Sequence, residues 1–246
     1  MEPRAKAGSW MKNWLAAGVL FGAVEHAYGQ QAIVTLPSAD ITEKGTLFMM
    51  NESQLRVWGD QPMWNATFFV TYGIGYHTEL AATFFNIGVP STGHASMAVG
   101  SKSALPLFAD KLPWLDLKIT AGVLGIVSLD SRGIGHWIYT HLSFRIPKLE
   151  TRLSAGISQG SEVLFFKENA TSFITAIEQP IPWLHGLTLT AEWFSGSHDL
   201  SNLIFGAAYH PNPKVIFVLG YKIPTKDRLW TTSEQALVFE MGAFFK

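Results

Sequence analysis

The chain has 246 residues, of which 48 % are hydrophobic, 13 % aromatic and only 15 % charged. The charged fraction lies well below the roughly 25 % of soluble domains, and a formal net charge of −1 argues against a nucleic-acid-binding surface. The sequence contains no cysteine, which excludes disulfides and a lipidated cysteine.

The first 29 residues are typical of a secretory signal peptide. Arg4, Lys6 and Lys12 precede an apolar run over residues 14–24, which is too short to cross a membrane as a helix. Ala27 and Gly29 provide small residues at positions −3 and −1 of a cleavage after Gly29. We therefore expect residues 1–29 to be a signal peptide; an amphipathic N-terminal helix is the alternative.

Residues 30–44 follow and lack a sustained alternation of apolar and polar residues. Ile33, Val34 and Leu36 would be exposed apolar side chains if this segment hung free in water. We expect the segment to insert partly into the domain that follows, as a small plug. A disordered periplasmic tail is the alternative.

From residue 45 to residue 246 the sequence alternates at period two, which indicates β-strands. In residues 214–224, for example, Val215, Phe217 and Leu219 share one face, whereas Lys214 and Lys222 lie on the other. The alternation predicts strands at 45–57, 63–75, 77–89, 94–105, 115–128, 136–147, 151–163, 170–180, 186–196, 201–210, 214–224 and 234–246.

About twelve strands, with one apolar face rich in aromatics and turns that alternate between short and longer, are typical of a transmembrane β-barrel. The predicted fold is an all-β, antiparallel, up-and-down barrel over residues 45–246, in the outer membrane of a Gram-negative bacterium. A soluble barrel or sandwich is the alternative. It would bury the aromatic face and leave the face of Gly, Glu and Lys in water.

Charged residues on the second face are candidates for lining the lumen. Their signs are nearly balanced, whereas a strongly selective pore needs a ring of one sign. They could equally pair across the interior as a polar core. The candidate lumen-lining residues are Glu52, Arg56, Glu79, Lys102, Asp116, Lys118, Arg145, Arg152, Glu178, Glu192, Lys222 and Glu240.

His198 and Ser201 are candidates for a catalytic base and nucleophile in the turn at residues 195–202. Outer-membrane lipid hydrolases use His and Ser on barrel strands, where the imidazole activates the hydroxyl. Two residues separate the pair here, so the side chains would point to opposite faces of a regular strand. A polar hairpin loop is the alternative, and no spacing resembles a metal site.

Residues 35–48 (TLPSADITEKGTLF) and 186–194 (GLTLTAEWF) resemble parts of exopolysaccharide-associated outer-membrane barrels. The resemblance covers about a tenth of the chain. It implies an outer-membrane location and envelope-polysaccharide biology, and it transfers no active residue.

We expect a narrow channel or binding protein for a small hydrophilic solute, with no enzymatic activity, cofactor or metal. The alternatives are a non-conducting scaffold that partners envelope or polysaccharide machinery, and a lipid-acting hydrolase. The expected partners are outer-membrane lipid and lipopolysaccharide, the barrel-assembly machinery and the solute; nucleic acid is not among them.

Overall fold

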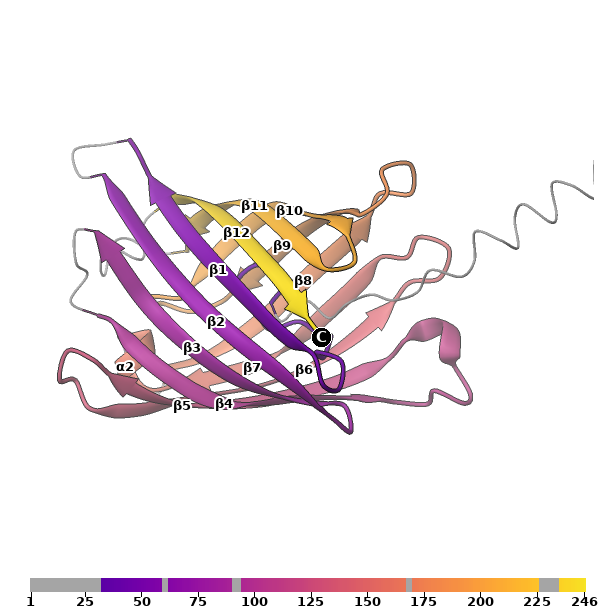
Figure 1. The fold of residues 1–246 in the computed structure, drawn as a ribbon, viewed down its shortest axis with the longest axis horizontal. Helices are drawn as coiled ribbons and strands as arrows, with labels where there is room; N and C mark the ends of the chain where they lie inside the picture. The colour runs from indigo at the N-terminus through magenta and orange to yellow at the C-terminus, as the bar shows by residue number, and fades with distance from the viewer. Residues whose placement is uncertain (1–31, 59–61, 90–93, 167–169, 226–234) are drawn as a thin grey trace, which may run out of the picture.

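The computed structural model describes residues 32–58, 62–89, 94–166, 170–225 and 235–246. Over these residues the chain forms a closed barrel of twelve strands in which each strand pairs antiparallel with its sequence neighbours and β1 pairs with β12 (Figure 1). The predicted fold class and strand number are confirmed. We call the end where Leu47 pairs with Phe245 the terminal end, and the opposite end the loop end.

The strand bounds agree with the sequence pattern to within a few residues at most ends. The strands are β1 (Leu47–Arg56), β2 (Met63–Gly75), β3 (Thr78–Val89), β4 (Ser96–Pro106), β5 (Lys118–Ser128), β6 (Ile134–Arg145), β7 (Arg152–Gly160), β8 (Ala170–Pro180), β9 (Leu187–Phe194), β10 (Asn202–Asn212), β11 (Val215–Pro224) and β12 (Ala236–Phe245).

The outer face of the wall is a continuous apolar belt. Along most of the strands, buried residues alternate with more exposed ones, as period-two geometry requires. Exposed belt residues include Phe68, Leu80, Val99, Val123, Ile138, Ile157, Phe173, Leu189, Phe205, Leu219 and Phe239. Such a belt suits contact with lipid rather than water. Among the described residues no helix is long and apolar enough to cross a membrane.

Two short elements interrupt the predicted pattern. The predicted strand 151–163 ends at Gly160, and the one-turn helix α2 (Glu162–Phe165) follows it at the loop end. The predicted strand 115–128 begins only at Lys118, after the 3-10 turn η1 (Pro113–Leu115). Asp116 therefore caps η1, with a left-handed φ of 41°, instead of lying within a strand.

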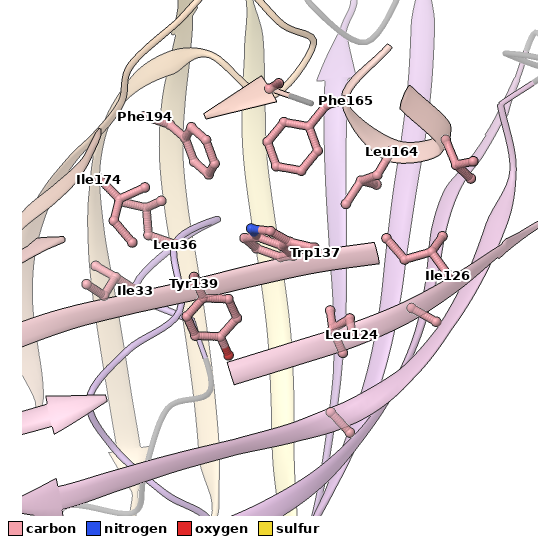
Figure 2. Close-up of a cluster of buried hydrophobic side chains, with 14 of the residues drawn as sticks. Ile33, Leu36, Leu124, Ile126, Trp137, Tyr139, Leu164, Phe165, Ile174 and Phe194 are labelled. Atoms are coloured by element: carbon pink, nitrogen blue, oxygen red, sulfur yellow. The ribbon is translucent and has the colours of Figure 1, made fainter. Parts of the chain in front are cut away.

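The lumen holds two apolar clusters in addition to its polar residues. One cluster, in Figure 2, joins the α2 residues Leu164 and Phe165 to Trp137, Tyr139 and Phe194 on the wall. The other gathers at β1, β10, β11 and β12 and includes Phe48, Ile204 and Ile216. Both clusters contain residues from the chain that precedes β1, so the interior is packed rather than open.

Candidate functional site in the barrel lumen

The described residues that precede β1 run into the barrel. Residues 32–37 form a tight turn closed by a 2.7 Å hydrogen bond from Ile33 N to Leu36 O and by a bridge between Ala32 and Pro37. Ile33, Val34 and Leu36 are at most 2 % exposed. We call residues 32–44 the inner segment; its apolar side chains are covered by the lumen wall.

Glu192 on β9 holds the tip of the inner segment. Its carboxylate accepts backbone N–H groups from Val34, Thr35 and Leu36 at 3.1, 2.8 and 3.1 Å, and the Thr35 hydroxyl at 2.5 Å. Hydrogen bonds to a charged acceptor are each stronger than neutral ones, and this set satisfies the N–H groups that a turn inside a barrel would otherwise leave unpaired.

A second attachment lies nearer the terminal end. Thr42 N donates to Glu79 Oε2 at 2.7 Å, and Lys102 Nζ donates to Ser38 O at 3.3 Å. Lys102 and Glu79 also form an ion pair at 3.2 Å. Gly73 on β2 lets the backbone pass, because a Cβ there would lie 2.2 Å from Thr42 O.

Asp40 provides a third attachment at the mouth of the terminal end. Arg152 Nη1 donates to Asp40 Oδ2 at 2.8 Å, and Lys118 Nζ lies 3.5 Å from Asp40 Oδ1. Burial raises the pKa of the Asp40 carboxyl, but the charges of Arg152 and Lys118 outweigh burial and lower the pKa to about 2. Asp40 is therefore an anion held in a basic site.

The predicted lumen residues fall into three positions. Asp116, Lys118, Arg145 and Arg152 meet at the mouth of the terminal end, where Asp116 pairs with all three cations at 3.1 to 3.6 Å. Glu178 lies opposite Arg152 in the β7–β8 register. The remaining predicted lumen residues lie deeper in the barrel and are at most 7 % exposed: Glu52, Arg56, Glu79, Lys102, Glu192, Lys222 and Glu240.

A cavity of about 110 Å³ remains between the inner segment and α2. One part of its wall is apolar and includes Trp137, Tyr139 and Phe194. Another part carries a chain of polar groups, in which Lys222 Nζ donates to Gln54 Oε1 at 2.5 Å and Gln54 Nε2 to Glu52 Oε1 at 2.6 Å. The volume exceeds several-fold the roughly 10–15 Å³ that one water needs.

The helix α2 borders this cavity at the loop end. Leu164 lines the cavity, and Phe165 packs on the His198 ring with centroids 4.6 Å apart. Gly160 makes room for the helix, because a Cβ at that position would lie 1.7 Å from the Phe165 ring. Asp199 N also donates to Phe165 O at 3.1 Å.

His198 and Ser201 interact through the backbone. His198 N donates to Ser201 Oγ at 3.0 Å, whereas His198 Nε2 lies 2.5 Å from Ser172 Oγ. Activation of a serine needs an imidazole nitrogen at its own hydroxyl. The described contacts make Ser201 a turn-forming residue and His198 part of the packing beneath α2.

The sequence did not single out Gln54, Trp137 or Phe194 as site residues. Trp137, Tyr139 and His141 share one face of β6, so the inward direction of the two aromatic side chains could be predicted from the period of two. Their meeting with α2 could not, because it depends on a turn of the chain after β7. Among the described residues no cluster of three His, Asp or Glu could hold a metal ion.

No protein-family model matches the chain, and no curated protein sequence matches it. Among solved structures it is similar to the NanC porin, with a TM-score of 0.53, 12 % identity, and coverage of 81 % of this chain and 99 % of the other. Omp33 of Acinetobacter baumannii covers 81 % of this chain and 98 % of its own at 10 % identity, with a TM-score of 0.49.

At such low identity the likeness to NanC concerns the fold. That fold, the closed antiparallel wall and the exposed apolar belt agree with one another. The chain is a β-barrel protein of the bacterial outer membrane.

Proposed function

We propose that the protein is a gated channel for a small hydrophilic solute and that the inner segment is its plug. The observation that carries this proposal is the cavity of about 110 Å³ that is lined by the inner segment, the wall and α2. Its wall combines aromatic faces with the hydrogen-bonding groups of Glu52, Gln54 and Lys222. Small-molecule sites commonly combine an apolar wall with a few placed polar groups.

The attachment of the inner segment supports a removable plug. Its hydrogen bonds go to side chains at separate points, chiefly Glu192, Glu79 and Arg152. The segment contributes no strand to the ladder that closes the wall. It can therefore leave the lumen without breaking the hydrogen bonds between the strands.

A second candidate is a non-conducting scaffold barrel that partners envelope or polysaccharide machinery. The packed interior favours it, because two apolar clusters fill much of the lumen. A permanently filled barrel offers its ends and loops to partners but passes no solute.

Conductance in planar bilayers separates the two candidates. We expect the parent protein to conduct rarely, and a variant that lacks residues 32–42 to conduct steadily, because the deletion removes the Glu192 and Asp40 attachments together. Heat-resistant migration in detergent gels would check that both barrels are closed. A closed deletion barrel that does not conduct would refute the channel and favour the scaffold.

We assign no catalytic step to His198 or Ser201. The Ser201 hydroxyl accepts a backbone N–H and donates to Ser195 O at 3.4 Å, which is a turn-stabilising role. Lipopolysaccharide against the outer leaflet and insertion by the barrel-assembly machinery are part of the same proposal.

A further inference from the structure

Asp40 occupies a site that is built from the barrel wall. Arg152 comes from β7 and Lys118 from β5, and they reach the same carboxylate at 2.8 and 3.5 Å. The side chain of Arg152 is 8 % exposed and that of Lys118 is 21 % exposed. The site is therefore largely desolvated, yet it remains open to the terminal end.

Two cations of the wall hold the carboxylate of the inner segment beside an acid of the wall itself. Asp116 contacts Lys118 at 3.4 Å and Arg152 at 3.1 Å. Asp40 adds a second carboxylate to the same two cations. The inner segment thus supplies one of the two carboxylates that Arg152 and Lys118 bind.

We propose that Arg152 and Lys118 form a binding site for the carboxylate of a small organic anion, and that Asp40 is a tethered occupant which such a solute displaces. This inference rests on the proposed channel function and names its solute class. Competition for the site would free the inner segment and open the lumen. The plug is then released by the solute that it excludes.

The geometry favours a singly charged carboxylate over a phosphate dianion. Arg152 Nη1 faces Asp40, while Nη2 is engaged by Asp116 Oδ2 at 3.1 Å. A dianion would bring a second negative charge close to Asp116 and Glu178. A planar monoanion reproduces the charge and shape of the group already present.

The tether sets the concentration at which a solute can compete. A short linker holds its bound group at an effective concentration on the order of millimolar. A free carboxylate of equal intrinsic affinity therefore needs millimolar concentrations to displace Asp40. The Glu192 attachment adds to this requirement, because it holds the same segment elsewhere.

The test compares opening of the full-length barrel in planar bilayers in potassium acetate, potassium chloride and potassium phosphate at equal ionic strength. We expect opening to rise with acetate over the millimolar range and to rise much less with the other two salts. Asp40→Asn should open without added acetate and lose the acetate dependence. Lys214→Gln, which removes a cation from the β10–β11 turn at the same end, should keep it.

Arg152→Gln and Lys118→Gln should both abolish the acetate response, and the second variant covers a failure of the first to fold. Equal responses to acetate and chloride, or an acetate response that survives both substitutions, would overturn the carboxylate site. A folded Asp40→Asn barrel that stays closed would also overturn it. If the carboxylate site is overturned but the barrel lacking residues 32–42 conducts, the proposed channel function still stands. If that barrel does not conduct either, both proposals fail.

Discussion

Glu52 and Glu240 lie directly opposite each other on β1 and β12, with both side chains inside the barrel. Glu52 is bonded to Gln54, whereas neither carboxyl oxygen of Glu240 has a hydrogen-bond partner among the described residues. Two acids at one cross-strand pair disfavour each other, and a buried carboxyl without a partner is costly.

Replacing Glu240 with an apolar residue should therefore stabilise the barrel. Glu240→Met removes the unpartnered carboxyl beside Val238 and Val218, and we expect about 1–3 kcal/mol of added stability. Glu52→Met is the matched control and should destabilise the barrel, because it removes the oxygen that accepts the hydrogen bond from Gln54 Nε2. Urea unfolding in lipid vesicles measures both. A Glu240→Met barrel less stable than the parent would indicate that this carboxyl has a partner.

The apolar belt predicts a position-dependent cost for a charge. Leu219 lies in the middle of β11 and is 60 % exposed. Leu219→Arg should cost about 2–4 kcal/mol in a bilayer. Leu149, 59 % exposed in the β6–β7 turn, is the control, and Leu149→Arg should be nearly neutral. Equal costs in vesicle refolding would contradict the position assigned to the belt.

The position of α2 beside the cavity depends on the absence of a side chain at residue 160. Gly160→Val should push Phe165 away from the wall and widen the cavity at α2. The parent sequence has no cysteine, so a single Leu164→Cys reports on exposure through its rate of thiol labelling. We expect faster labelling in the Gly160→Val background.

Gly125→Val is the control for this substitution, because a Cβ there meets nothing nearer than Val99 O at 3.8 Å. Labelling should stay slow in that background. Unchanged labelling in both would mean that α2 stays seated without the space at Gly160.

The Asp40 attachment should weaken in acid. The pKa of Asp40 is lowered from 3.8 to about 2, so the attachment is fully present above about pH 4 and is lost as the pH falls toward 2. The shift corresponds to roughly 2 kcal/mol. The charged or titratable groups around the Asp40 site are Lys102, Asp116, Lys118, His141, Arg145, Arg152, Glu178 and His210.

Bilayer conductance measured from pH 5 down to pH 2 should rise in the parent and stay flat, and high, in Asp40→Asn. Identical pH profiles for the two proteins would assign the response to other acids of the lumen, such as Glu178.

The strands of the barrel wall could be predicted from the sequence, because lipid on one side of the wall imposes an apolar residue at every second position of each strand. The helix α2 could not be predicted, since residues 162–163 continue the alternation of β7. The space for its inward turn comes from Gly135 and Gly160, which lack side chains. The sequence pattern placed Asp116 in a strand because the three residues of η1 are too few to show a helical spacing of apolar residues.

The hydrogen-bond and ion-pair partners of the charged lumen residues could not be predicted from the sequence either. Alternation gives the face on which Glu192 lies, but its bond to Thr35 joins positions 157 residues apart. Burial of the inner segment was expected from Ile33, Val34 and Leu36. The choice of Asp40 as the group that meets Arg152 follows only from the register of β5 and β7.

The packed lumen has a consequence for the chain before it folds. Ile216 and Val218 on β11 are buried in the interior cluster while Leu219 faces outward, so this strand is apolar on both faces. Residues 215–220 carry no charge and no proline, a composition that self-associates as β-structure when unpaired. Pro213, Lys214, Lys222 and Pro224 flank the run and act as gatekeepers against aggregation during transit through the periplasm.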